Sequence, residues 1–323
     1  MIAVEHLTKR YGSFTAVDDI SFTLEQGHIY GFLGPNGAGK STTMNMMTGC
    51  LAATAGSVTI DGLDIFEQAR EAKKLLGYLP EIPPLYPEQT PEEYLRFVAE
   101  AKGLPKAQIE AQVAKALAET RLEPMANRLI RHLSKGYRQR VGIAQALLGD
   151  PRYIILDEPT VGLDPLQIIE IRDLIHELGQ THTVILSSHI LSEVQAICES
   201  VLIIAHGKLV AFDTPQNLES RLTSGGRLTL SADCSAEALH RILAAVPAVC
   251  DCRLLTAEEG RCKAQLEITG DAAEACKVLF FAFAKAETAI LQLTPEKADL
   301  ENIFIELTDA QPDGKEPRHE SDL

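Results

Sequence analysis

The chain has 323 residues, a formal net charge of −15, 46% hydrophobic residues and 23% charged residues. This composition is typical of a soluble globular protein of roughly two domains, and its acidity argues against nucleic acid or an anionic membrane surface as direct partners. No apolar run reaches the roughly eighteen residues of a membrane span, the N-terminus lacks a secretory signal pattern, and seven scattered cysteines favour free thiols in a reducing cytoplasm.

The first part of the chain is rich in short strand patterns. Alternating apolar and polar residues predict antiparallel strands at 2–7 and 15–24. A short apolar strand at 28–34 runs into a glycine-rich loop, after which STTMNMM begins a helix. Further strands are predicted at 56–62 and 75–80. The pattern is that of a sheet-forming N-terminal region.

Residues 90–150 read almost entirely as helix. The stretch TPEE at 90–93 is a capping box with proline at the first helical position, and the helix it opens ends at Gly103. A second, alanine-rich helix follows at about 105–120. This region is predicted to be an α-helical insertion into an α/β fold.

Two continuous apolar strands follow the helical region. YIILD at 153–157 and TVILSS at 183–188 are of the type that is buried in parallel sheets. Between them, Asp164 begins a helix that ends at Gly179.

The last third of the chain predicts a separate small domain. SRLTSGG at 220–226 is the candidate linker. Beyond it the elements follow the order β-α-β-β-α-β of the ferredoxin-like pattern. They are expected at 227–231, 235–245, 249–256, 261–268, 272–284 and 287–294. One more helix is expected at 298–308, before a polar tail expected to be disordered.

The glycine-rich loop GPNGAGKS at 34–41 fits G-x-x-x-x-G-K-S in the strand-to-helix context that this motif requires. Its backbone amides at 36–39 are expected to face phosphates. Lys40 would neutralise the β- and γ-phosphates, and Ser41 would bind Mg²⁺. The expected nucleotide-binding residues here are Gly34, Pro35, Asn36, Gly37, Ala38, Gly39, Lys40, Ser41 and Thr42.

Three polar residues follow the two apolar strands. Asp157 is placed to hold the metal, and Glu158 to orient or deprotonate an attacking water. The alternative is a pair of solvated acids at a strand end. His189 directly follows the other strand and is expected to contact the γ-phosphate; its alternative is a core or capping histidine.

The stretch LSKGYRQR at 133–140 has the features of a second anion site. Ser134 can cap a helix, Gly136 lets a ligand approach the backbone, and basic residues follow. One chain would then carry two loops suited to a triphosphate.

Together these motifs resemble the ATP-binding cassette (ABC) ATPases over residues 2–220. The family order is aromatic loop, Walker A, glutamine loop, signature, Walker B, D-loop and switch histidine. The chain shows, in that order, Tyr11, GPNGAGKST at 34–42, GYLPE at 77–81, LSKGYRQR at 133–140, YIILDEP at 153–159, GLDP at 162–165 and His189. The resemblance implies a P-loop NTPase fold with an antiparallel β subdomain and a helical insertion, and an ATPase that uses ATP and Mg²⁺.

The resemblance also accounts for the second loop. In the family two cassettes dimerise head to tail, so Ser134 and Gly136 would meet the γ-phosphate held by the partner's P-loop. Tyr11 would stack on adenine, with an exposed turn tyrosine as the alternative. Asp164 is predicted as a helix cap, and its loop would also cross the dimer interface.

The chain departs from the family pattern at two motifs. Lys135 and Tyr137 replace Gly and Gln of the usual LSGGQ signature, and Glu81 stands where the glutamine loop has Gln. Glu81 would contact the metal or water, or else be a solvated loop acid. Both variants occur in type-two ABC exporters, which the chain resembles most and which often carry a C-terminal appendage.

The predicted domains are therefore an ABC ATPase domain at 1–220 with a helical subdomain at 90–150, a ferredoxin-like accessory domain at 221–309, and a tail at 310–323. The accessory domain would either bind a regulatory small molecule or support the dimer. Its cysteines lack the C-x₂₋₄-C spacing of zinc sites, so core packing is favoured over a metal. They are Cys234, Cys250, Cys252, Cys262 and Cys276.

The function implied is the ATP-hydrolysing subunit of an exporter. A homodimer would grip a separate membrane permease through the helical insertion and the 80–95 loop, at the inner face of the cell membrane. Membrane contact would occur through the permease only, with no nucleic acid bound. The alternative is a soluble ABC ATPase acting on ribosomes or DNA, against which the single cassette and the acidic composition argue.

Overall fold

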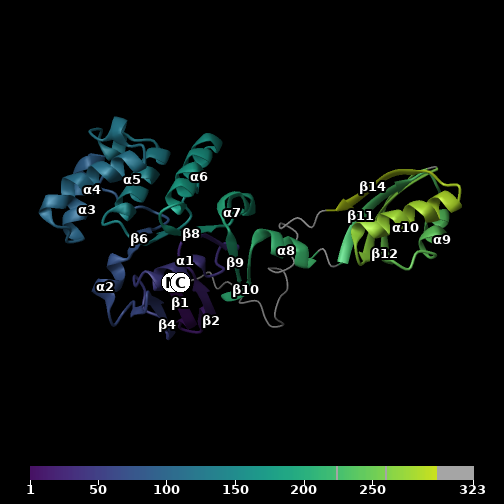
Figure 1. The fold of residues 1–323 in the computed structure, drawn as a ribbon, viewed down its shortest axis with the longest axis horizontal. Helices are drawn as coiled ribbons and strands as arrows, with labels where there is room; N and C mark the ends of the chain where they lie inside the picture. Colours follow the sequence, from purple (N-terminus) through teal and green to yellow (C-terminus); the bar gives the residue numbers. More distant parts are fainter. Residues whose placement is uncertain (223–224, 259, 297–323) are drawn as a thin grey trace, which may run out of the picture. The chain divides into compact units, whose positions relative to one another are not determined.

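A computed structural model of the protein describes residues 1–222, 225–258 and 260–296 (Figure 1). The chain divides into two compact units between Thr214 and Pro215. A helix, α8 (Pro215–Leu222), occupies the start of the linker predicted at 220–226, and strand β11 begins at Gly225. The helix predicted at 298–308 and the tail lie outside the described residues. Within the described part, no helix is long and apolar enough to cross a bilayer.

A six-stranded sheet forms the centre of the first unit (Figure 1). Its strands, in spatial order, are β10 (Lys208–Asp213), β9 (Ser200–Ala205), β3 (Ile29–Leu33), β8 (Thr183–Ser188), β7 (Tyr153–Leu156) and β6 (Leu76–Leu79). All neighbours are parallel except β10, which pairs antiparallel with β9. Every residue of β3, β7 and β8 is buried, as their continuous apolar runs predict. Since β8 lies between β3 and β7, the carboxyl ends of these three strands meet at one sheet edge.

A second, antiparallel sheet packs against the first. Its order is β2 (Phe14–Leu24), β1 (Ile2–Tyr11), β4 (Ala55–Ile60) and β5 (Leu63–Asp64). Inward-facing apolar residues of both sheets join one core with helix α1 (Lys40–Met47). Within it the rings of Phe22 and Phe32 meet edge to face at 5.5 Å. This packing fixes the start of α1, where the glycine-rich loop ends.

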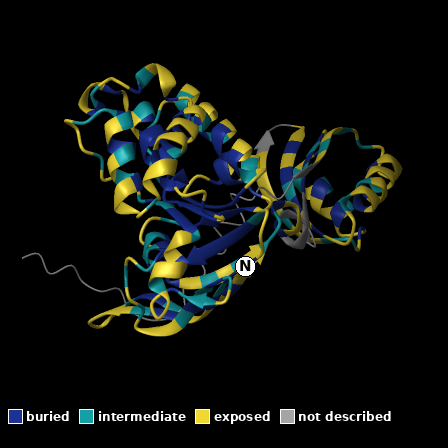
Figure 2. Cartoon of the chain, turned by 60° about the vertical axis from the view of Figure 1, so that its left-hand side comes forward, coloured by how far each residue is buried: buried dark blue, intermediate teal, exposed yellow. Residues whose placement is uncertain are grey.

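The helical insertion has its own core. It comprises α3 (Pro91–Ala101), α4 (Lys106–Glu119) and α5 (Lys135–Leu147), whose apolar faces pack together. The predicted capping box is present, because the Thr90 hydroxyl accepts from the Glu93 amide and the Glu93 carboxylate accepts from the Thr90 amide. Burial follows the inward stripe of α3 and α4, whereas most of α5 is buried (Figure 2).

Three further helices complete the first unit. Short α2 (Ala69–Lys74) precedes β6, and α6 (Pro165–Gly179) joins β7 to β8. The last, α7 (Leu191–Ile197), follows β8 directly. As predicted, Asp164 caps α6, since its carboxylate accepts from the Gln167 amide at 2.9 Å.

The second unit has the predicted element order β-α-β-β-α-β. The elements are β11 (Gly225–Ala232), α9 (Ala236–Leu243), β12 (Val249–Glu258), β13 (Arg261–Thr269), α10 (Ala272–Lys285) and β14 (Ile290–Glu296). The strands form an antiparallel sheet in the order β12-β13-β11-β14. Buried residues of both helices pack with those of the sheet. The thiols of Cys234 and Cys262 are in this core, whereas Cys250 is exposed.

Candidate active site

The glycine-rich loop at 34–39 joins β3 to α1 at the carboxyl edge of the parallel sheet. Gly39 has a φ of +108°, and a Cβ there would lie 2.6 Å from the Ala16 carbonyl oxygen, so only glycine fits. Lys40 is 6% exposed, and its ammonium donates to the carbonyls of Gly34 at 2.8 Å and Pro35 at 3.3 Å. The amide of Ala38 donates to the Pro35 carbonyl at 3.2 Å, so in this structure it is turned into the loop. The loop therefore holds a buried cation by backbone carbonyls.

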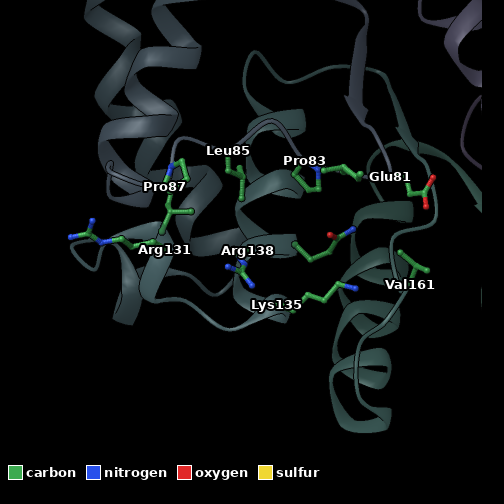
Figure 3. A pocket seen from close by; sticks show the side chains of 11 residues that line it. Glu81, Pro83, Leu85, Pro87, Arg131, Lys135, Arg138 and Val161 are labelled. Carbon is green, nitrogen blue, oxygen red and sulfur yellow. The ribbon is translucent and has the colours of Figure 1, made fainter.

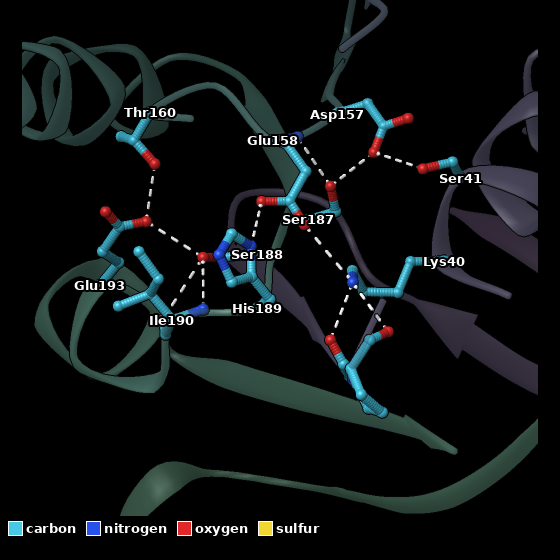
Figure 4. A network of polar contacts seen from close by, with 12 residues as sticks. Lys40, Ser41, Asp157, Glu158, Thr160, Ser187, Ser188, His189, Ile190 and Glu193 are labelled. Atoms are coloured by element: carbon cyan, nitrogen blue, oxygen red, sulfur yellow. Dashed lines mark hydrogen bonds and ion pairs between the residues drawn. The ribbon is translucent and has the colours of Figure 1, made fainter. Parts of the chain in front are cut away.

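Asp157 directly follows β7 and is 2% exposed. One of its carboxylate oxygens accepts hydrogen bonds from the Ser187 hydroxyl at 2.6 Å and the Ser41 hydroxyl at 3.1 Å (Figure 4). Ser187 belongs to β8, the strand between β3 and β7. The Asp157 carboxylate thus links the middle strand to the first turn of α1.

Glu158 adopts the left-handed region at φ 48°, an uncommon conformation for a residue with a side chain. Its amide donates to the Ser187 hydroxyl at 2.7 Å. One carboxylate oxygen lies 3.4 Å from the Lys40 ammonium, and the other lies 2.9 Å from Nδ1 of His189 (Figure 4). The carboxylate is therefore held between a buried cation and an imidazole that is itself partly exposed.

Lys40, Ser41, Glu158 and His189 line one cavity of about 440 Å³. Its lining comprises Tyr11, Phe14, Ala16, Asn36, Gly37, Gly39, Lys40, Ser41, Thr42, Glu81, Glu158, Val161 and His189. The structure thus brings together most of the residues predicted for nucleotide binding, whereas Gly34, Pro35, Ala38 and the predicted metal ligand Asp157 are not part of the lining. Phe14, Ala16 and Val161 were not predicted. Phe14 is 62% exposed beside Tyr11. A second aromatic residue so close to Tyr11 in the sequence could have identified it as part of the same site.

Tyr78 is a further polar group near the acids. Burial raises the pKa of its phenol, and the negative charge of Asp157 raises it further. The phenol therefore stays protonated and donates to the Asn45 side-chain oxygen at 3.1 Å. Because Asn45 lies on α1, this bond joins β6 to the helix that follows the loop.

The signature residues lie outside this cavity. Ser134 caps α5 as predicted, its hydroxyl accepting from the Tyr137 amide at 3.3 Å. Ser134 and Gly136 line a second cavity of about 250 Å³ together with Asp164 and residues of α6. Within the chain, therefore, the two loops predicted to bind anions line different cavities.

The ammonium of Lys135, the first departure from the usual signature, lies against the D-loop. A Cβ on Gly162 would be 2.2 Å from it, and Gly162 also has a φ of +67°. The positive φ favours glycine at this position, and a side chain there would also displace the flexible end of Lys135.

A third cavity, of about 570 Å³, is a groove along the helical insertion. Its lining comprises Glu81, Ile82, Pro83, Leu85, Pro87, Ile130, Arg131, Lys135, Arg138, Gln139 and Val161. Figure 3 shows Glu81 and Val161 at one end of the groove and Pro87 and Arg131 at the other. The buried Nε2 of Gln139 has no hydrogen-bond partner among the described residues. Glu81 lines both this groove and the first cavity.

The first cavity suits a metal-bound triphosphate. Hydroxyl and carboxylate oxygens are preferred Mg²⁺ ligands, and Ser41 and Asp157 present one of each within hydrogen-bond distance. In the described part of the chain, no cluster of three or more His, Cys, Asp or Glu could hold a metal alone. The residues present thus fit an ion that also takes oxygens from a phosphate and water.

Comparison with known proteins agrees with this geometry. Residues 17–161 match the family described as ABC transporter. The linearmycin resistance ATP-binding protein LnrL of Bacillus subtilis is 34% identical over 95% of this chain and 98% of its own length. The bacitracin transport ATP-binding protein BcrA of Bacillus licheniformis is 41% identical over 65% of this chain and 68% of its own. The Nod factor export ATP-binding protein I of Ralstonia nicotianae is 37% identical over 68% of each chain.

Solved structures agree as well. An ATP-binding subunit of an ABC transporter superposes with a TM-score of 0.62 at 33% identity, covering 69% of this chain and 93% of its own. A second, cbiO1 from Clostridium perfringens, part of the cbiONQ transporter complex, gives a TM-score of 0.62 at 28% identity over 68% and 91%. The chain therefore belongs to the ABC transporter family, as an ATP-binding subunit that hydrolyses ATP.

Proposed function

We propose that this chain is the energy-supplying subunit of an exporter, in which two copies close around two ATP molecules and drive a separate membrane permease. One observation carries the dimer: Ser134 and Gly136 line a different cavity from the P-loop of their own chain. Each ATP site is then completed by a second copy.

Within one site, the residues take the following roles. The loop amides and Lys40 bind the β- and γ-phosphates of ATP, and Ser41 and Asp157 would hold Mg²⁺, which would neutralise charge on the phosphates. Glu158 accepts a proton from the attacking water through its buried carboxylate. His189, which contacts that carboxylate at 2.9 Å, orients it and contacts the γ-phosphate. Tyr11 and Phe14 offer an aromatic surface for adenine at the mouth of the cavity.

The signature acts from the partner chain. The N-terminus of α5 carries no acidic residue in its first turn, and such a terminus stabilises an anion by about 0.3–1 kcal/mol. A contact made only when ATP is bound gives ATP a higher affinity for the closed dimer than for the open one. That difference allows hydrolysis to drive a conformational cycle.

Complementation between two inactive chains tests the shared site. Lys40→Met removes the P-loop cation, and Gly136→Asp places an acid at the signature. Each homodimer has two defective sites. In a mixed dimer one site combines both defects and the other combines two intact halves. We expect each variant alone to be nearly inactive and an equimolar mixture to recover about a quarter of wild-type ATPase, since half the dimers are mixed and each has one intact site.

The measurement is steady-state ATP hydrolysis as the ratio of the two variants is titrated. A maximum near equal amounts supports the shared site. Activity that stays at the level of the single variants at every ratio, while light scattering shows mixed dimers, contradicts it.

The groove along α5 is proposed as the permease contact. Ile82 is 82% exposed in it, and Lys135 and Arg138 add positive charge beside Gln139, whose side-chain amide is unpartnered among the described residues. A helical cytosolic segment with an apolar face and an acidic residue fits this lining. The names of three relatives refer to resistance, transport and export, which favours an export role on the inner face of the membrane.

Ile82→Asp tests this contact. We expect the purified chain to keep its ATPase within roughly twofold, because an exposed substitution outside the active site perturbs stability little. Capture of a polytopic membrane protein from solubilised membranes should be lost, since the new charge is desolvated in an apolar interface. Ile82→Leu is the matched control and should retain capture. Equal capture by both variants would place the permease elsewhere.

A further inference from the structure

Glu193 is a buried carboxylate that the roles above do not use. It lies on α7, is 4% exposed, and contributes nothing to the lining of the cavity that holds Lys40. A single oxygen, Oε2, accepts from the Thr160 hydroxyl at 2.7 Å and the Ser188 hydroxyl at 3.0 Å (Figure 4). In the described part of the chain, no cation pairs with it.

Such a group contributes little to stability by itself. Moving a carboxylate out of water is costly, and hydroxyl donors offset that cost only in part. An apolar side chain of similar volume would fill the same space without a desolvation penalty. The hydrogen bonds of Glu193 therefore serve mainly to fix the relative position of the two segments that they join.

The two donors belong to the two segments that carry the catalytic pair. Thr160 is two residues after Glu158, and Ser188 directly precedes His189. The Ser188 hydroxyl also accepts from the Ile190 amide at 2.9 Å, so the backbone is held on both sides of His189. One carboxylate oxygen thus connects the loop after β7 to the end of β8.

Glu158 needs such support because its backbone is in the left-handed region. Strained conformations persist only where the surroundings fix them. On one side the Glu158 amide donates to Ser187, and on the other Thr160 is tied to Glu193.

We propose that Glu193 is a positioning residue that fixes the separation of Glu158 and His189 by joining Thr160 to Ser188. The proposal rests on the roles given to Glu158 and His189 in the proposed function. Glu193 itself touches neither nucleotide nor water in this scheme.

Three full-length variants test it. Glu193→Ala removes the acceptor, Glu193→Gln keeps one oxygen able to accept from both hydroxyls, and Ser192→Ala changes the exposed neighbour on the same helix. We expect Glu193→Ala to lower kcat by roughly 10- to 100-fold with a KM for ATP within about threefold, since a small misplacement of catalytic groups can cost about 100-fold. Glu193→Gln and Ser192→Ala should stay within about threefold of wild type.

Rescue by the conservative variant separates positioning from a loss of folded protein. We expect the kcat of folded Glu193→Ala, measured well below its melting temperature, to fall as stated, and that of Glu193→Gln to return to near the wild-type value. A residue that only stabilises the fold would lower the melting temperature of Glu193→Ala while leaving the kcat of its folded fraction unchanged, and this result would overturn the proposal. A kcat for Glu193→Ala within about twofold of wild type would also overturn it. Thr160→Val, which removes one donor at nearly constant volume, gives the same test should Glu193→Ala not fold.

Glu158→Gln, measured alongside, separates this inference from the proposed function. If Glu158→Gln is inactive while Glu193→Ala is fully active, only the role of Glu193 is wrong. If Glu158→Gln turns over ATP at the wild-type rate, the proposed chemistry is wrong.

Discussion

Glu158→Gln is expected to lower ATP turnover by about 10²- to 10⁴-fold, the usual contribution of a general base. The substitution keeps the side-chain volume, so the contacts of the backbone with Ser187 remain, and one oxygen can still face His189. What is lost is the ability to accept a proton. ATP affinity should change little, because the loop and Lys40 are intact. Steady-state hydrolysis and equilibrium nucleotide binding measure the two effects separately.

Glu81→Gln is the matched control, since it removes another carboxylate from the lining of the same cavity. It restores the residue usual in the family and should leave turnover within about tenfold of wild type, because no catalytic proton transfer is assigned to it. With ATP, the Glu158→Gln chain should accumulate as a dimer in light scattering. Turnover above about a tenth of wild type would show that another group activates the water.

Lys40→Met is expected to nearly abolish ATP binding. The Lys40 ammonium is the buried cation of the loop, 3.4 Å from a Glu158 carboxylate oxygen that is also buried. Removing one member of a buried, hydrogen-bonded charge pair typically costs about 2–5 kcal/mol. In the proposed site the same ammonium pairs with the phosphates of ATP, and a loss of that size in binding free energy corresponds to a dissociation constant raised roughly 30- to several-thousand-fold. Isothermal titration with ATP and Mg²⁺ measures it.

Lys73→Met is the matched control for this variant, because Lys73 is exposed and donates to the Gly49 carbonyl at 3.0 Å, with no acidic partner among the residues that the structure describes. It should bind ATP as wild type does. The Glu158 carboxylate that is left without Lys40 gives a second readout. Lys40→Met should lower the melting temperature because this buried charge loses its cation, and adding Glu158→Gln should restore much of the loss. Additive losses would show that the two groups are independent.

The parts of the fold with strong local signals were predicted from the sequence. The buried strands of the parallel sheet are continuous apolar runs, and the capping box at Thr90 and the aspartate at 164 define the starts of α3 and α6. The linker prediction at 220–226 was wrong at its start, because helix α8 extends to Leu222. The start of this helix could have been recognised, since the Thr-Pro pair at 214–215 is the same helix-start signal as the pair at 90–91. Strands β9 and β10 were not predicted. The signal for β9 was present, because SVLIIA is a continuous apolar run like those of β7 and β8, whereas β10 alternates weakly and is recognised by its pairing with β9.

The side-chain network of the site required the three-dimensional structure. The loop residues, Asp157, Glu158 and His189 follow from motifs, whereas Ser187 and Glu193 belong to no motif. An acid in the first turn of a short helix resembles a solvated residue in sequence, and the packing of α7 against α6, β3 and β8 accompanies the burial of Glu193 in the structure. That Ser134 and Lys40 line different cavities was implied by the family resemblance and not by any spacing rule.

The position of β8 between β3 and β7 has a consequence for how the enzyme can change. The same strand supplies Ser187, which contacts both acids, and ends at the histidine that touches Glu158. A slide of this strand along its own axis would alter all three contacts together. Substitutions of residues that pack against β8 would therefore change Mg²⁺ affinity and proton transfer together. This coupling restricts how the rate of ATP hydrolysis can evolve.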